Sequence, residues 1–201
     1  MKEQIYLLFI ATIFFLSGCA PEESAVADIE MKSNEELSVM TDSFTQDDFY
    51  NKLSHVMEEA ENFEAEGDLE KWIIRTLSEE ALYYAEDLTE DEIIVIAKER
   101  LTEDQVWKEI AEKKYGVTVS EEELNQYIDN ITQSFESPLQ LAYADVLGLT
   151  VEQLNHGFDL DVYEKNLLWE KLKPKLEEEY GTSDSNKLVE RYNEEVSEGS
   201  R

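Results

Sequence analysis

The sequence predicts an all-α protein, and three observations lead to this prediction. Large apolar residues recur at intervals of three and four along most of the chain, which is the spacing of one face of an α-helix. Serine or threonine is repeatedly followed, three residues later, by the acidic or amide residue of a capping box. Strand signals are nearly missing, since the longest alternating run is Val117-Thr118-Val119. We therefore expect several helices packed into one domain.

The segment 113–124 carries the clearest local signal. Gly116 suits the left-handed backbone that closes a helix, and Lys113 and Lys114 suit the negative end of the helix dipole. Ser120 is expected to cap the next helix, with Glu123 returning a hydrogen bond to the N–H of Ser120. The chain should turn here between two helices.

The other helices are placed by the same kinds of signal. Thr45 with Asp48 opens a helix that stops before Gly67, and a second helix covers 69–88. Thr89 opens a third segment that runs to Gly116, either as one helix or with a break at Leu101-Thr102-Glu103.

Three further signals complete the pattern in the second half of the chain. Ser137-Pro138 opens a short helix that ends at Gly148, because proline is well suited to the first helical position. Thr150 with Gln153 opens a longer helix toward Tyr180, in which Pro174 should produce a kink or an early end. Residues 182–201 should form a polar tail or a peripheral helix, with one weak apolar set at Leu188, Val189, Tyr192 and Val196.

The first residues have the pattern of a signal peptide. An apolar run from Ile5 to Leu16 follows Lys2 and is too short to span a bilayer as a stable helix. The run ends in Leu16-Ser17-Gly18-Cys19, which resembles the lipobox of bacterial lipoproteins, whose cysteine is diacylated and becomes the first mature residue. The alternative is a cysteine packed in a core. We expect a signal peptide at 1–18 and a lipid anchor at Cys19 that holds the protein on the extracytoplasmic face of the cell membrane.

The composition of the chain after the signal peptide predicts a spacer followed by a helical domain, and its charge disfavours some classes of partner. Residues 19–44 are expected to be a flexible spacer with a possible short ordered piece at Leu37 to Met40, and residues 45–181 to be the helical domain. The chain has 48 acidic against 17 basic residues and a net charge of -31, which argues against nucleic-acid binding. This charge either keeps an exported domain soluble or attracts basic clients.

The segment from about Glu92 to Tyr180 resembles the N-terminal chaperone domain of SurA-type chaperones and PrsA-type lipoprotein foldases. The resemblance is carried by residues 111–124, by Ile128 and by Leu147-Gly148-Leu149-Thr150-Val151-Glu152-Gln153-Leu154. It implies an all-α SurA N-terminal-like domain that binds unfolded polypeptides. Family foldases begin with a short strand and continue into a parvulin-type isomerase domain, whereas about twenty polar residues follow Gly181 here. We therefore expect no prolyl isomerase activity.

Few residues suit catalysis or metal binding. Only His55 and His156 are present, and the single cysteine excludes a disulfide within the chain. Asp159-Leu160-Asp161 lacks the glycine and terminal glutamate of a calcium loop. We expect no enzyme, no cofactor and no metal site.

Tyrosines are the candidates for a binding surface. Most aromatic residues at helical spacing belong to a core, but five tyrosines could instead line a groove that holds clients: Tyr83, Tyr84, Tyr127, Tyr143 and Tyr163. The first hypothesis is a membrane-anchored chaperone-like protein that binds unfolded or exported polypeptides. The alternative is a specific adaptor or structural lipoprotein that binds one partner or forms a homodimer. An unrecognised enzyme or a solute-binding protein is a weaker third hypothesis.

Overall fold

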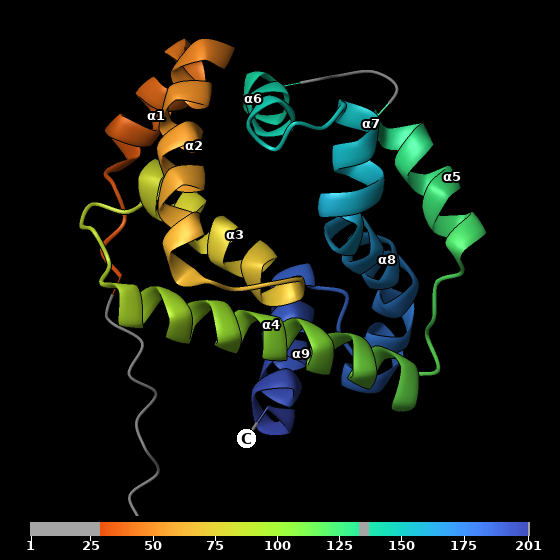
Figure 1. Ribbon diagram of the computed structural model, residues 1–201. Helices are drawn as coiled ribbons and strands as arrows, with labels where there is room; N and C mark the ends of the chain where they lie inside the picture. The colour runs from red at the N-terminus through yellow and green to blue at the C-terminus, as the bar shows by residue number, and fades with distance from the viewer. Residues whose placement is uncertain (1–28, 133–136, 201) are drawn as a thin grey trace, which may run out of the picture.

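The computed structural model describes residues 29–132 and 137–200, and its regular elements are all helical (Figure 1). The predicted all-α class is therefore confirmed. The helices are α1 (Asn34–Ser43), α2 (Gln46–Ala60), the short 3-10 helix η1 (Glu61–Phe63), α3 (Asp68–Tyr83), α4 (Glu90–Lys113), α5 (Glu121–Thr132), α6 (Pro138–Val146), α7 (Val151–Gln153), the π-helical turn η2 (Leu154–Phe158), α8 (Leu160–Tyr180) and α9 (Ser185–Gly199).

The predicted helix starts are present as hydrogen-bonded caps. Capping boxes open α2 at Thr45, α4 at Thr89 and α7 at Thr150. At Ser120 the hydroxyl accepts from the N–H of Glu123 at 3.2 Å, and the Glu123 carboxylate accepts the N–H of Ser120 at 2.9 Å. These bonds satisfy donors that have no partner inside the helix, which is why such local patterns determine where helices begin.

The described helices enclose three clusters of buried side chains, two of which adjoin through α2 and α3 and are treated together as the N-terminal core. The N-terminal core is formed by α1, α2, α3, α6 and the first half of α4: Met40, Phe49, Leu53, Val56, Ile73, Ile74, Leu77, Leu82, Ile93, Ala97 and Ala142. The C-terminal core is formed by the second half of α4, the following linker, α8 and α9: Trp107, Ala111, Val117, Leu168, Leu172, Leu176, Leu188, Tyr192 and Val196. Only α4 contributes buried residues to both, so this helix joins the two halves of the fold.

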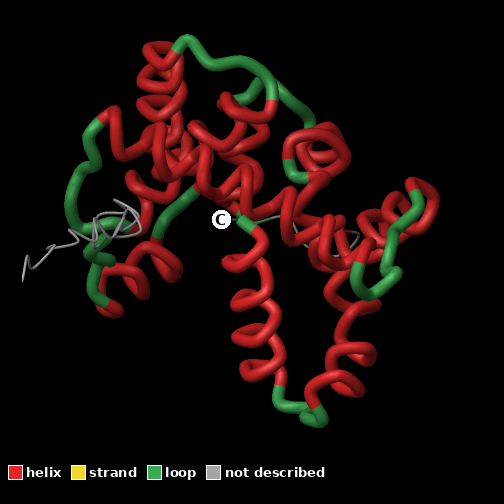
Figure 2. The backbone as a smooth tube through the Cα atoms, turned by 90° about the horizontal axis from the view of Figure 1, so that it is seen from below, coloured by secondary structure: helices red, strands yellow, loops and turns green. Residues whose placement is uncertain are grey.

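The C-terminal residues 185–199 form the core helix α9. Figure 2 shows α8 and α9 as an antiparallel pair joined by a short loop. Leu188 and Tyr192 are fully buried, and the Tyr192 hydroxyl donates a 2.8 Å hydrogen bond to the carbonyl of Trp107 on α4. Val189, which we grouped with them from the sequence, is 41% exposed. The helix expected as one of the two alternatives is therefore present, but it is not peripheral, because its narrow apolar stripe completes the C-terminal core.

Two expectations for the long helices are settled by the structure. α4 continues without a break through Leu101-Thr102-Glu103, and the Thr102 hydroxyl donates to the carbonyl of Lys98 one turn back. α8 also continues through Pro174 to Tyr180, so the expectation that proline ends this helix early is wrong. Leu172 and Leu176 on either side of Pro174 are fully buried, and this packing holds the helix together despite the missing hydrogen bond.

The expected spacer at 19–44 is too long, because α1 occupies residues 34–43. Ser33 and Glu36 form a capping box that opens α1, and Met40 is buried in the N-terminal core. Before α1, an isolated antiparallel bridge joins Met31 to Tyr84 at the end of α3. Residues 29–44 thus belong to the folded domain, whereas the signal-peptide and Cys19 predictions fall outside the described residues.

Replacing Leu188 by alanine should lower the free energy of unfolding by about 2–5 kcal/mol, because it leaves a cavity in the C-terminal core. Val189→Ala is the matched control on the same helix and should change stability by less than about 0.5 kcal/mol. Urea denaturation followed by circular dichroism measures both. Equal, small effects would show that α9 does not pack on the domain.

Candidate functional site

A cavity of about 400 Å³ lies beneath α1 and is the best candidate for a binding site; we call it the α1 cavity. Its apolar lining comes from α1, the α1–α2 turn and the end of α3: Val39, Met40, Phe44 and Leu82. Val39 is 56% exposed, so an apolar surface is open to solvent here. Methionine and aromatic side chains at such a place can adapt to differently shaped apolar groups.

Charged residues form the rest of the wall of the α1 cavity: Lys32, Glu35, Glu36 and Lys52. The Lys32 ammonium donates a 3.0 Å hydrogen bond to the carbonyl of Ala81, which fixes it near the end of α3. Burial and the charge of Lys52 lower the pKa of Lys32, while the charges of Glu36, Asp87 and Glu80 oppose this shift. The two ammonium groups therefore repel one another at the cavity.

The structure does not bring the five candidate tyrosines into one groove. Tyr84 is 6% exposed and its hydroxyl is held between Glu79 and Arg100, so it offers little surface to a client. Tyr83 and Tyr143 pack against the N-terminal core. These three side chains are thus explained by the packing of α3, α4 and α6.

The other two tyrosines lie elsewhere. The Tyr163 hydroxyl donates a 3.0 Å hydrogen bond to Oδ1 of the buried Asn155 in η2, and Gln140 of α6 donates to the same oxygen at 2.8 Å. Tyr127 lies on α5 and is directed to Glu170 of α8 at 3.3 Å. The sequence did not predict the α1 cavity. Its charged and apolar lining residues come from segments that are separated along the chain, and only the tertiary fold brings them together.

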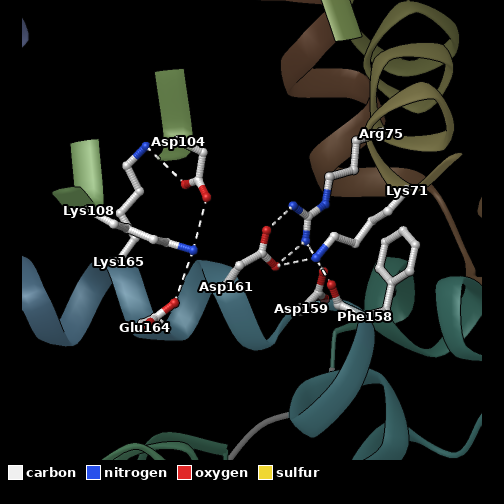
Figure 3. A network of polar contacts seen from close by, with 9 residues as sticks. All are labelled: Lys71, Arg75, Asp104, Lys108, Phe158, Asp159, Asp161, Glu164 and Lys165. Carbon is white, nitrogen blue, oxygen red and sulfur yellow. Dashed lines mark hydrogen bonds and ion pairs between the residues drawn. The ribbon is translucent and has the colours of Figure 1, made fainter. Parts of the chain in front are cut away.

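A network of charged side chains connects the two halves of the fold (Figure 3). The two terminal nitrogens of the Arg75 guanidinium on α3, Nη1 and Nη2, donate to the two oxygens of the Asp161 carboxylate on α8, at 2.7 and 2.8 Å. The guanidinium carbon also lies 5.1 Å from the ring centroid of Trp72 and 5.2 Å from that of Phe158. Planar, bidentate and stacked contacts of this kind are specific to arginine.

A second group of charges continues the same network on α4 and α8. Asp104, which is 8% exposed, accepts from Lys108 at 2.9 Å and lies 3.6 Å from Lys165. Lys108 also contacts Glu164 at 3.0 Å. Because every charge in this group has a partner, the network is best explained as a structural connection between the two halves.

The π-helical turn η2 places His156 against α5. Its Nδ1 lies 3.1 Å from Oδ1 of Asn125, and its Nε2 lies 3.3 Å from Oδ1 of Asp129. These contacts hold α5 against η2, the turn that precedes α8. His55, by contrast, is highly exposed beside Glu58. Within residues 29–132 and 137–200, no group of three or more His, Cys, Asp or Glu side chains could hold a metal ion.

Comparisons with known proteins add no functional information. No family model, no curated protein and no solved structure matches the chain. Among the helices of the described part of the chain, none has the length and apolar character needed to cross a membrane.

The Arg75–Asp161 pair predicts a dependence of stability on pH. Burial alone would raise the pKa of Asp161, but hydrogen bonds and charge from Arg75, with a smaller effect of Lys71, lower it to about 2. A carboxylate with a lowered pKa stabilises the folded state above its ordinary pKa of about 4 and loses this contribution as the pH falls toward its folded pKa. Asp161→Asn should therefore lower the free energy of unfolding by about 2 kcal/mol at neutral pH.

The difference between this variant and the parent chain should shrink as the pH falls from about 5 to about 2. Asp87→Asn is the control, since Asp87 is exposed and makes no ion pair with a described residue. Urea unfolding at a series of pH values checks the prediction. A difference that stays constant across this range would mean that the ionised pair contributes nothing.

Proposed function

We propose that this chain is a chaperone-like protein, tethered to the outer face of the cell membrane through Cys19, that binds unfolded or exported polypeptides without isomerising prolyl bonds. The observation that carries the proposal is the α1 cavity. It exposes an apolar lining that includes a methionine and a phenylalanine, and its volume of about 400 Å³ is sufficient for a large apolar side chain and part of the neighbouring backbone. A site of this kind supports weak binding of many sequences.

The charge of the chain supports the same proposal. A net charge of -31 keeps the domain soluble while a client is bound, and it increases the rate at which basic segments meet the domain. The resemblance to SurA-type and PrsA-type chaperone domains is consistent with this role. Of the two histidines, His55 is exposed and His156 is held by two polar side chains.

The proposal is tested with residues 20–201, which contain both cores of the described structure. This protein should suppress the light scattering of several unrelated unfolding proteins at comparable molar ratios. Val39→Trp should fill the α1 cavity and weaken client binding by about tenfold, while helix content stays unchanged.

Val189→Trp is the matched control, because Val189 is also an exposed helical valine but lies on α9, far along the chain from the cavity. It should bind clients as the parent protein does. Equal suppression by both variants would exclude the α1 cavity as the client site. If the parent protein suppresses nothing and instead binds one saturable partner or dimerises, the adaptor hypothesis replaces the chaperone proposal.

A further inference from the structure

We propose that the α1 cavity recognises the carboxyl end of a polypeptide, with the last apolar side chain inside the cavity and the free carboxylate between Lys32 and Lys52. This inference rests on the proposed function, since it names the part of a client that the cavity holds. It is carried by the charges at the cavity, by its apolar lining and by its size.

Among the described lysines, Lys32 and Lys52 share with Lys98, Lys173, Lys175 and Lys187 the lack of a carboxylate partner within 4.0 Å, but only these two line the α1 cavity. With 48 acidic and 17 basic residues, most cations would be expected to have a carboxylate partner, and several lysines on α3, α4 and α8 do. Within the described part of the chain, no carboxylate oxygen lies within 4.0 Å of the ammonium of Lys32 or Lys52. An anion placed between them would relieve their mutual repulsion.

The position of each lysine is determined by a different element. Lys32 is held by the carbonyl of Ala81, at the end of α3, whereas Lys52 extends from α2 with its ammonium 6.0 Å from the ring centroid of Phe44. A carboxylate has two oxygens and can accept from both ammonium groups at once. Charge-assisted hydrogen bonds of this kind are stronger than neutral ones.

The two glutamates of the cavity limit the charge that it can accept. The Glu36 carboxylate already accepts from the N–H of Ser33 at 2.9 Å and from its hydroxyl at 2.7 Å, so it is engaged in capping α1. Glu35 is exposed and remains as an uncompensated negative charge. The cavity wall therefore carries two ammonium and two carboxylate groups, so a singly charged anion is favoured over a phosphate, whose second negative charge would be repelled by Glu35.

The shape and polarity of the α1 cavity determine which chemical group can accompany the carboxylate of the ligand. The apolar lining favours an aromatic or aliphatic group next to the charge, and burial of this group would contribute most of the affinity. A volume of about 400 Å³ holds one large side chain and a little backbone but not a folded surface. The end of a chain meets both conditions, since its last residue carries an apolar side chain beside a free carboxylate.

The test compares two peptides that differ only in this charge. An acetylated alanine peptide that ends in phenylalanine is titrated into residues 20–201 as the free acid and as the C-terminal amide, with affinity measured by calorimetry. The free acid should bind about tenfold more tightly, the difference expected from one or two charge-assisted hydrogen bonds. Lys52→Met should remove this preference.

Lys98→Met is the matched control, because it removes the same charge from an exposed lysine on α4 and should keep the tenfold preference. Equal binding of acid and amide, or an unchanged preference in Lys52→Met, would overturn the inference. Decanoate supplies the same carboxylate on an alkyl chain; if it binds tightly while the peptide acid does not, the ligand is a fatty acid and the inference also fails.

Failure of the inference and failure of the proposed function give different results. If acid and amide bind equally, and Val39→Trp weakens both, the α1 cavity holds polypeptide without reading the carboxylate. If neither peptide binds but unfolding clients are still kept in solution, the inference fails and clients bind elsewhere. If neither peptide binds and no client is protected, both proposals are wrong.

Discussion

The fold depends on the way that α4 is shared between two cores. Its first half contributes Ile93 and Ala97 to the N-terminal core, and its second half contributes Trp107 and Ala111 to the C-terminal core. Between these two halves, Asp104 and Lys108 of α4 form ion pairs with Lys165 and Glu164 of α8. Beside them, Arg75 of α3 forms two hydrogen bonds with Asp161 of α8. Burying charges is expensive unless each finds a partner, so this junction tolerates few arrangements of α3, α4 and α8. Apolar packing alone would permit the two halves of the fold to shift relative to each other, and the charged pairs between them favour one relative position.

Local sequence signals were sufficient for most helix boundaries. The caps at Thr45, Thr89, Ser120 and Thr150 involve only residues three positions apart, so the sequence contains the whole interaction. Predictions failed where distant packing decides the outcome. Pro174 predicts a kink or an early end of α8, but its neighbours are buried against α4 and α9 and the helix continues to Tyr180. The short ordered piece expected at Leu37 to Met40 is part of α1, which extends over 34–43 because Met40 packs with α2, α3 and α6.

The candidate site was less predictable than the fold, because it also depends on packing between segments that are distant in the sequence. Tyrosine was chosen because its amphipathic ring suits a binding groove, yet Tyr84 and Tyr163 use their hydroxyl groups in internal hydrogen bonds. The residues that line the α1 cavity are ordinary when considered one at a time. Lys32, Val39, Lys52 and Leu82 line one cavity only because α1, α2 and the end of α3 meet in the folded chain, which no periodicity of the sequence indicates.

The bridge between Met31 and Tyr84 has a mechanical consequence. The N–H of Lys32 donates to the carbonyl of Tyr83, and the N–H of Ala85 donates to the carbonyl of Glu30, both at 2.8 Å. Any pull on the chain before residue 29 reaches these two hydrogen bonds before it reaches α1. Tension from the N-terminal side is therefore passed first to the end of α3 and to the N-terminal core behind it, and α1 is loaded only after these two hydrogen bonds break.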